Sequence, residues 1–136
     1  MKVGLVDTNV LIYAAVGFET ERVKWERAHA LLDHAPHCLS AQNLAEFVNT
    51  IIRKMKRPVA EAARWLEYFD YMDVQPVDRE IVLGGTVLSE RFRINYWDAA
   101  LIVAAQRMKV GVLYTEDLNH GQVYDGITAI NPFLDQ

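Results

Sequence analysis

The sequence Val3-Gly4-Leu5-Val6-Asp7-Thr8-Asn9-Val10-Leu11-Ile12 places an acidic residue between two apolar runs. The first run has the length of a short buried strand, and Asp7 stands where that strand ends. In open parallel sheets, the ligand crevice lies at the carboxyl ends of the strands. A carboxylate there can face solvent while its own strand stays in the core. Asp7 is therefore a candidate site residue.

Length and composition indicate a globular protein. The chain has 136 residues, of which 51% are hydrophobic and 24% charged, so a single domain over residues 1–136 can bury a core. Cys38 is the only cysteine, which excludes an internal disulfide and suits a reducing compartment. No apolar run approaches the roughly 20 residues that span a bilayer, and the N-terminus lacks a signal-peptide pattern. We therefore expect a soluble, cytoplasmic protein without membrane contact.

The charge balance argues against bulk electrostatic binding of nucleic acid. The chain has 14 basic and 18 acidic residues, a net charge of −4, whereas proteins that coat nucleic acid usually carry a basic excess. An enzyme that acts on nucleic acid is still allowed. Acidic residues gathered in one metal site lower the net charge, while a local basic cluster such as residues 53–57 can contact phosphates.

Apolar runs and helical periods alternate along the chain. Strands are expected at residues 3–6, 37–39, 73–77, 110–114 and 127–130, and helices at residues 19–34, 41–55, 59–72, 79–92 and 96–105, with a short helix or turn at residues 10–16. Ser40, Asp78 and Asn95 suit helix N-caps. The pair Gly84-Gly85 is either a weak point of its helix or a close contact between helices. The alternation predicts an α/β fold with helices on both faces of a mainly parallel sheet.

The helix expected at residues 41–55 has the clearest period. Its apolar residues recur at spacings of three and four and form one face, made of Leu44, Phe47, Val48, Ile51, Ile52 and Met55. Glu46 lies nearly opposite that face, and Asn49 and Arg53 share its side of the helix. A cleft lined by this side would bring all three together, so Asn49 and Arg53 are candidate RNA contacts.

Four carboxylates stand out by their positions. Asp7 and Asp117 follow strands, Asp98 begins a helix, and Glu46 lies on the polar side of another. Carboxylates that pack together repel one another unless they are protonated or bridged by a cation. Without a cysteine cluster or paired histidines, the fitting cation is Mg²⁺ or Mn²⁺, which prefers oxygen ligands. Such an ion supports hydrolysis of phosphoesters.

Each acid also has a simpler interpretation. Asp98 can complete a helix cap with Asn95, and Asp7 or Asp117 can cap a following turn. Glu46 can be a solvated surface acid. For a lone acid the structural role is the commoner one, but the joint pattern favours the metal site.

Four motifs give the chain a specific resemblance. They are Val6-Asp7-Thr8-Asn9-Val10-Leu11, Asn43-Leu44-Ala45-Glu46-Phe47, Tyr96-Trp97-Asp98-Ala99-Ala100-Leu101 and Tyr114-Thr115-Glu116-Asp117-Leu118. In this order the chain resembles a PIN domain, and within that superfamily a VapC-type toxin. The resemblance implies a three-layer α/β/α domain with a central, mainly parallel sheet of about four to five strands. It also implies an endoribonuclease that depends on magnesium or manganese, is usually dimeric and is held inactive by a cognate antitoxin.

The same resemblance implies roles for individual residues. By motif matching, Asp7, Glu46, Asp98 and Asp117 would form the acidic metal site. Thr8, Asn9 and Thr115 would support it through hydrogen bonds to the acids or to bound water. No acid of the pattern is missing, so an active enzyme is expected.

Other functions fit the sequence less well. A haloacid-dehalogenase-like phosphatase needs a second acid two residues after the first, where this chain has Asn9. A phosphoacceptor receiver domain needs an acidic pair after its first strand and a lysine after a late strand, and neither is evident. A PIN-fold nuclease that processes RNA, or a non-catalytic module that binds RNA or protein, remains open because fold alone does not give activity.

Overall fold

A four-stranded sheet forms the centre of the fold. The computed structural model describes residues 2–134. The sheet contains β1 (Leu5–Val6), β4 (Val112–Tyr114), β5 (Val123–Tyr124) and β6 (Ile127–Ile130) in the spatial order β1-β4-β6-β5. β1, β4 and β6 are parallel, whereas β5 pairs antiparallel with β6. The mainly parallel sheet is confirmed, but β5 was not expected from the sequence.

Two further strands lie beside β1. β2 (Leu39–Ser40) and β3 (Val74–Gln75) pair in parallel, and a bridge between Leu5 and Cys38 joins this pair to the main sheet. β3 ends directly before Pro76, which has no N–H to donate to a ladder. The expected edge strand is therefore present but shorter than predicted.

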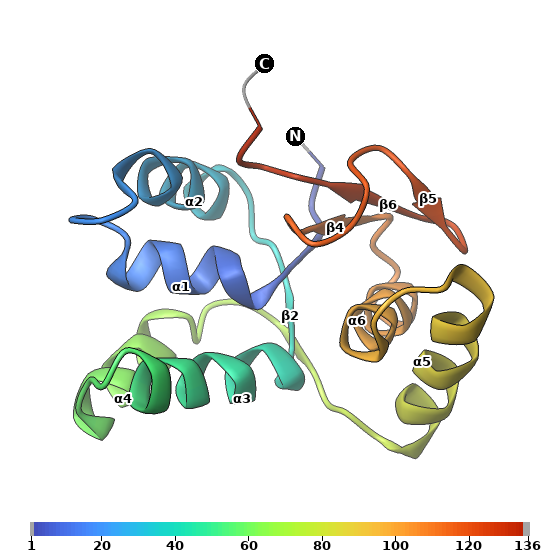
Figure 1. Cartoon of the computed structure of the whole chain (residues 1–136), viewed down its shortest axis with the longest axis horizontal. Helices are drawn as coiled ribbons and strands as arrows, with labels where there is room; N and C mark the ends of the chain where they lie inside the picture. Colours follow the sequence, from blue (N-terminus) through green and yellow to red (C-terminus); the bar gives the residue numbers. More distant parts are fainter. Residues whose placement is uncertain (1, 135–136) are drawn as a thin grey trace.

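Helices cover both faces of the sheet, as predicted. They are α1 (Thr8–Val16), α2 (Arg22–His34), α3 (Ala41–Asn49), the π-helix η1 (Thr50–Lys54), α4 (Val59–Tyr68), α5 (Arg79–Phe92) and α6 (Tyr96–Arg107). Figure 1 shows α1 and α2 on one side of the sheet and α5 and α6 on the other. Within residues 2–134, no helix is both long enough and apolar enough to cross a bilayer.

Each face of the sheet has its own apolar core, because successive strand residues point to opposite faces. Val6, Val112 and Tyr114 pack with residues of α1 to α4. Leu5 and Leu113 pack with α5 and α6 on the other face. The buried strands thus hold their carboxyl ends in fixed positions between the two helical layers.

The helix that begins at Ala41 changes its geometry halfway. After α3, η1 continues with the Met55 N–H donating to the Thr50 carbonyl at 2.9 Å, a five-residue hydrogen bond. This wider turn rotates the residues that follow. Phe47 and Ile51 are buried as predicted, but Met55 is 37% exposed, so its expected place on the apolar face was wrong.

A close contact between α5 and α6 explains the glycine pair. A Cβ atom at Gly85 would lie 3.1 Å from the Ala100 Cα atom, so a larger residue would push the helices apart. The interpretation as a helix contact is therefore confirmed. The contact fixes α6, which carries Asp98 in its first turn.

Candidate metal centre

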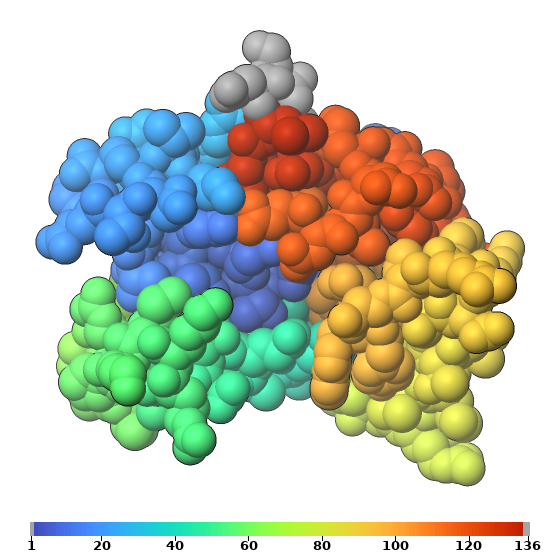
Figure 2. Space-filling model, viewed as in Figure 1, coloured from blue at the N-terminus to red at the C-terminus, as the bar shows by residue number. Residues whose placement is uncertain are grey.

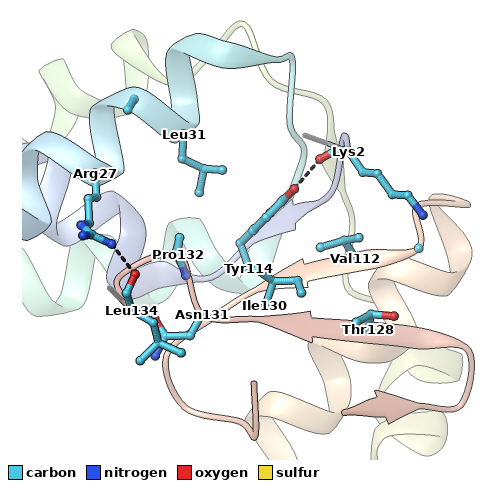
Figure 3. A pocket seen from close by; sticks show the side chains of 12 residues that line it. Lys2, Arg27, Leu31, Val112, Tyr114, Thr128, Ile130, Asn131, Pro132 and Leu134 are labelled. Atoms are coloured by element: carbon cyan, nitrogen blue, oxygen red, sulfur yellow. Dashed lines mark hydrogen bonds between the residues drawn. The ribbon is translucent and has the colours of Figure 1, made fainter. Parts of the chain in front are cut away.

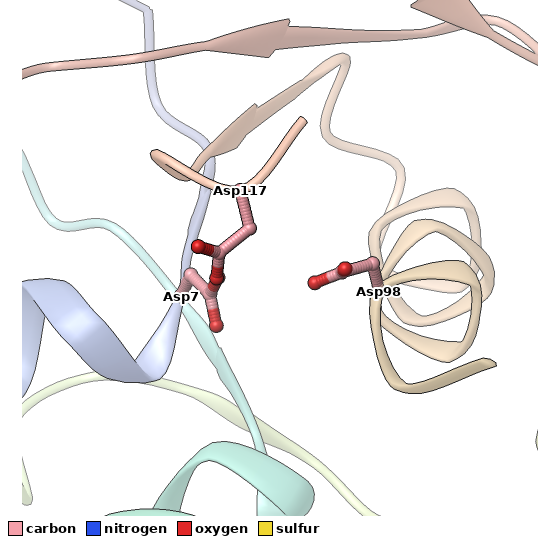
Figure 4. A group of neighbouring side chains, drawn as sticks. All are labelled: Asp7, Asp98 and Asp117. Carbon is pink, nitrogen blue, oxygen red and sulfur yellow. The ribbon is translucent and has the colours of Figure 1, made fainter. Parts of the chain in front are cut away.

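Three aspartates meet at the carboxyl ends of the central strands. Asp7 follows β1 and caps α1, Asp117 lies in the loop after β4, and Asp98 stands in the first turn of α6. One carboxylate oxygen from each lies within 4.8 Å of the other two. In Figure 4 the three side chains point toward one another from these separate elements. We call them the aspartate cluster.

Asp7 is the most buried acid of the cluster. It is 5% exposed, its Oδ1 accepts a hydrogen bond from the Thr8 N–H at 2.6 Å, and its Oδ2 accepts one from the Thr115 hydroxyl at 2.7 Å. Burial raises the pKa of the Asp7 carboxyl to about 7 in spite of these hydrogen bonds, and the charges of Asp98 and Asp117 raise it further. Asp7 therefore both caps α1 and belongs to the aspartate cluster.

Asp98 lacks the compensation that Asp7 receives. Asn95 caps α6 by accepting from the Trp97 N–H at 2.8 Å, while no group among residues 2–134 donates a hydrogen bond to the half-buried Asp98 carboxylate. Burial raises its pKa to about 6, and Asp117 and Glu46 add to the effect. A bound cation would remove this electrostatic cost, whereas the alternative role of completing the cap is not observed.

Side chains from the same elements order the cluster. The Thr115 hydroxyl donates to Asp7 and accepts from the Asp117 N–H at 3.1 Å, so it links two of the acids. The Asn9 Nδ2 group donates to Asp117 Oδ2 at 3.3 Å. The Asn9 Oδ1 atom is buried and has no partner among the described residues. An unsatisfied buried acceptor beside the cluster suits a site that binds a cation with its waters.

Glu46 lies beside the aspartate cluster and is not one of the three carboxylates within 4.8 Å. Its Oε1 atom accepts from the Thr8 hydroxyl at 3.3 Å and from the Gln42 side chain at 3.1 Å. Its charge nevertheless raises the pKa of Asp98, so the two carboxylates share one electrostatic environment. The structure thus brings Asp7, Asp98 and Asp117 together and holds Glu46 at their margin.

Two buried amides beside Glu46 were not predicted as site residues. Asn43 is fully buried, donates to the Thr8 hydroxyl at 3.2 Å and accepts from the Ser40 N–H at 2.9 Å. The Gln42 amide bridges α3 to α6 by donating to Glu46 and, at 3.0 Å, to the Trp97 carbonyl. The spacing of Gln42 four residues before Glu46 was the only sequence signal for this contact.

The candidate RNA contacts lie farther along the same helix. Asn49 and Arg53 are exposed and line a groove of about 620 Å³ between α3, η1 and α4. Asn49 also lines a second groove, of about 720 Å³, together with Glu46. Each groove contains two of the three residues that were predicted to share a cleft.

Glu116 is turned away from its neighbour Asp117. Its carboxylate accepts from the Tyr13 hydroxyl at 2.6 Å and forms an ion pair with Lys24 at 3.0 Å. This contact ties the loop after β4 to α1 and α2, and it leaves Asp117 as the only acid of the Thr115-Glu116-Asp117 stretch in the cluster.

A further cavity lies away from the aspartates. It has a volume of about 570 Å³ and is lined by α2, β4, β6 and the segment after β6 (Figure 3). Leu31, Val112 and Ile130 make much of its surface apolar, and none of the three aspartates contributes to it. Among residues 2–134, those that line the cavity offer no group of acids to a cation.

The donor set of the cluster fits a hard divalent cation. All of its ligands are carboxylate oxygens, and two of the three carboxyls have raised pKa values because their charges are buried together. Mg²⁺ and Mn²⁺ take such ligands and neutralise the repulsion between them. The arrangement is thus able to hold a cation at a surface that a phosphodiester can approach through the exposed Asp117.

Comparisons with known proteins agree with this architecture. Among solved structures, a chain of a toxin–antitoxin complex from Klebsiella pneumoniae superimposes with a TM-score of 0.67 at 20% identity, covering 95% of this chain and 97% of that one. A chain of VapBC2 from Rickettsia felis, bound to a promoter DNA fragment, superimposes with a TM-score of 0.65 at 13% identity. This match covers 92% of this chain and 95% of that one. A chain of FitAcB from Neisseria gonorrhoeae has a TM-score of 0.65 at 18% identity, and the match covers 95% of this chain and 97% of that one.

These three similarities show a shared fold. A search among curated proteins finds none that matches the chain. The model of the PIN domain family matches residues 4–126, a stretch that contains the whole aspartate cluster. The chain therefore belongs to the PIN domain family.

Proposed function

We propose that this PIN domain is an endoribonuclease that depends on Mg²⁺ or Mn²⁺ and acts as the toxin of a toxin–antitoxin pair. The observation that carries the proposal is the aspartate cluster, whose three carboxylates converge within 4.8 Å at the carboxyl edge of the sheet. The raised pKa values of Asp7 and Asp98 support it, because an arrangement of buried acids that costs stability is a mark of functional sites.

Asp7, Asp98 and Asp117 would hold the cation. A divalent cation bound there lowers the pKa of a water molecule and stabilises the negative charge that develops on the phosphodiester. Thr115 would hold Asp7 and Asp117 in fixed positions relative to each other, because its hydroxyl forms hydrogen bonds with both residues. Asn9 would orient Asp117 through its amide.

Glu46 is the fourth acid of the proposed catalytic site. Thr8 and Gln42 both donate to its Oε1 atom, and no described residue donates to Oε2. The carboxylate is therefore oriented through one oxygen and free at the other to accept a proton or a hydrogen bond from water or RNA. In this proposal Thr8 and Gln42 position Glu46, while the aspartates carry the cation.

RNA would extend from the cluster along α3. Asn49 exposes an amide, and Arg53 makes no ion pair with any residue in 2–134. An unpaired guanidinium is suited to bind a phosphate, and its contribution is sequence-independent. The acidic net charge of the chain is compatible with this local contact.

A cognate antitoxin and a second copy of the chain are the proposed protein partners. Their support is the sequence resemblance to VapC-type toxins together with similar folds in proteins whose structures are toxin–antitoxin complexes. Toxicity separates this proposal from a PIN nuclease that processes RNA. Expression of the wild-type chain should arrest growth of a bacterial host, and expression of the Asp7→Asn variant should not.

Cleavage of total cellular RNA by purified protein tests the nuclease proposal. The reactions contain Mg²⁺, Mn²⁺ or EDTA, with wild-type protein and the Asp7→Asn variant side by side. We expect discrete fragments that require the metal and disappear in the variant. Well-folded protein, free of any partner, that cleaves no RNA would favour a non-catalytic binding module.

A further inference from the structure

An apolar groove begins beside the aspartate cluster. It has a volume of about 720 Å³ and lies between α3 and the first turns of α5 and α6. Its lining consists of Ala41, Gln42, Ala45, Glu46, Asn49, Val77, Val82, Tyr96 and Trp97. Figure 2 shows a notch in the outline of the molecule, with the teal atoms of α3 and the orange-yellow atoms of α6 at its top and the yellow-green start of α5 on one side.

Trp97 is the most unusual residue of this groove. Its side chain is 57% exposed, although a large indole ring normally seeks burial. It is bonded directly to Asp98, so its Cα atom lies 3.8 Å from that of a cluster residue. Most of the ring surface is therefore open to a molecule that binds next to Asp98.

Neighbouring contacts hold Trp97 in place. Its carbonyl accepts from the Gln42 amide at 3.0 Å, which ties it to α3. Its ring packs edge-to-face against Tyr96, with centroids 5.2 Å apart and an angle of 73° between the planes. These contacts already restrict the residue, so little conformational entropy remains to be lost when a ligand binds. The ring is therefore preorganised as a stacking surface.

The chemistry of the groove favours a nucleobase over a phosphate. Val77, Val82 and Ala45 give it apolar walls, and among the described residues that line it only the anionic Glu46 is charged. A phosphate would be repelled there, whereas a base presents a neutral aromatic face and polar edges. The Gln42 and Asn49 amides line the same groove and can meet such edges.

We propose that the exposed ring of Trp97 stacks on an unpaired base of the RNA substrate next to the scissile phosphate. The inference rests on the proposed function and adds a substrate subsite to it. Stacking on an aromatic side chain contributes to binding of single-stranded nucleic acid and tolerates different bases. The enzyme would therefore require an unpaired nucleotide at this position of its target.

The stacking is tested by a double-mutant cycle in which the Trp97 ring and the RNA base are removed separately and together. The cleaved bond is first mapped in total cellular RNA. Short RNAs spanning that bond are then made with each of the two flanking nucleotides on either side replaced in turn by an abasic ribose. The efficiency of cleavage, kcat/KM, is measured for wild type, Trp97→Leu and Tyr71→Leu. Tyr71 is a matched control because it is 55% exposed and contributes to neither groove beside α3.

One abasic position should lower the wild-type efficiency by about 5- to 150-fold, the range given by the energy of stacking one base. Trp97→Leu should lose a similar factor on the intact RNA and lose nothing more on that abasic RNA. Tyr71→Leu should behave as wild type on every RNA.

Two results would overturn the inference, and both are distinguishable from failure of the proposed function. In the first, Trp97→Leu equals wild type on intact RNA; if this variant also loses affinity for a protein partner, the groove is assigned to that partner. In the second, Trp97→Leu loses the same factor on intact and abasic RNA, which indicates a shift of Asp98. A wild-type protein that cleaves no RNA contradicts the proposed function and the inference together.

Discussion

The Thr115 hydroxyl donates a hydrogen bond of 2.7 Å to the Asp7 carboxylate, although the two residues are 108 positions apart in the chain. The pairing of β1 with β4 makes this contact, because Val6 lies opposite Tyr114 in the parallel ladder. The next residue of each strand then emerges at the same edge. The register of two short buried strands thus sets the geometry of the proposed metal site.

Replacement of Thr115 by valine should weaken binding of Mn²⁺ by about 10- to 100-fold, the usual effect of losing a residue that orients a metal ligand. Valine keeps the shape of threonine but neither donates to Asp7 nor accepts from the Asp117 N–H. Calorimetric titration measures the affinity. Thr86→Val is the control, since Thr86 is exposed on α5 and should have no effect. Equal affinities for both variants would remove Thr115 from the site.

Asp7→Asn should stabilise the metal-free protein at pH 8. Burial raises the pKa of Asp7 from 3.8 to about 7, so the folded state holds this proton more tightly than the unfolded chain does. The free energy of unfolding of the wild type therefore falls as the pH rises from about 4 through 7. The Asp7→Asn variant avoids this loss because asparagine does not ionise. The gain should reach about 1–4 kcal/mol above pH 7 and shrink toward pH 4, as measured by urea unfolding.

Asp78→Asn provides the matched control for that experiment. Asp78 also caps a helix, α5, but its pKa is lowered by the Ile81 N–H and by Arg107. Loss of its charge should lower the free energy of unfolding at pH 8, opposite in sign to the Asp7 variant. If Asp7→Asn also lowered the free energy of unfolding at pH 8, the ionised Asp7 carboxylate would not be destabilising in the folded protein.

Cation binding should release protons near neutral pH. The carboxyls of Asp7 and Asp98 have pKa values of about 7 and about 6, and a bound cation requires both to be ionised. At pH 6.5, binding should release about one proton per cation, and affinity should fall as the pH decreases. Titrations of Mn²⁺ in buffers with different ionisation enthalpies count these protons. Release that stays near zero at this pH would contradict the raised pKa values.

Glu46→Gln should separate metal binding from catalysis. Glu46 lies outside the three carboxylates that converge, so its variant should keep Mn²⁺ affinity within about threefold and still lose most RNA cleavage. Asp98→Asn should lose both, because it removes a proposed ligand. Affinities of the two variants are compared under identical conditions. A large loss of affinity in Glu46→Gln would make Glu46 a direct ligand.

Local chemistry made the helix starts predictable. Ser40, Asp78 and Asn95 accept hydrogen bonds from the N–H groups of their helices, as their positions before apolar periods indicated. The acids that follow β1 and β4 were equally visible, since each ends a short apolar run. Their convergence could be expected because parallel strands share one carboxyl edge.

Other features depended on contacts between distant segments. β5 is two residues long and pairs with β6 through a tight turn at Gly126, so it has too little periodicity to be recognised. The change from α3 to a π-helix leaves the apolar spacing of the sequence intact, which hid the exposure of Met55. The second partner of the Gln42 amide is the Trp97 carbonyl of α6. This contact depends on how α6 lies relative to α3, which no local sequence pattern indicates.

The position of manganese in crystals soaked with MnCl₂ tests the central claim most directly. Anomalous scattering at the manganese edge locates the ion without reference to activity, and the Asp98→Asn variant provides the comparison. We predict a peak between the carboxylates of Asp7, Asp98 and Asp117 in the wild type, and its loss in the variant. Manganese bound elsewhere, in protein that cleaves RNA when the metal is present, would contradict the aspartate cluster as the metal site.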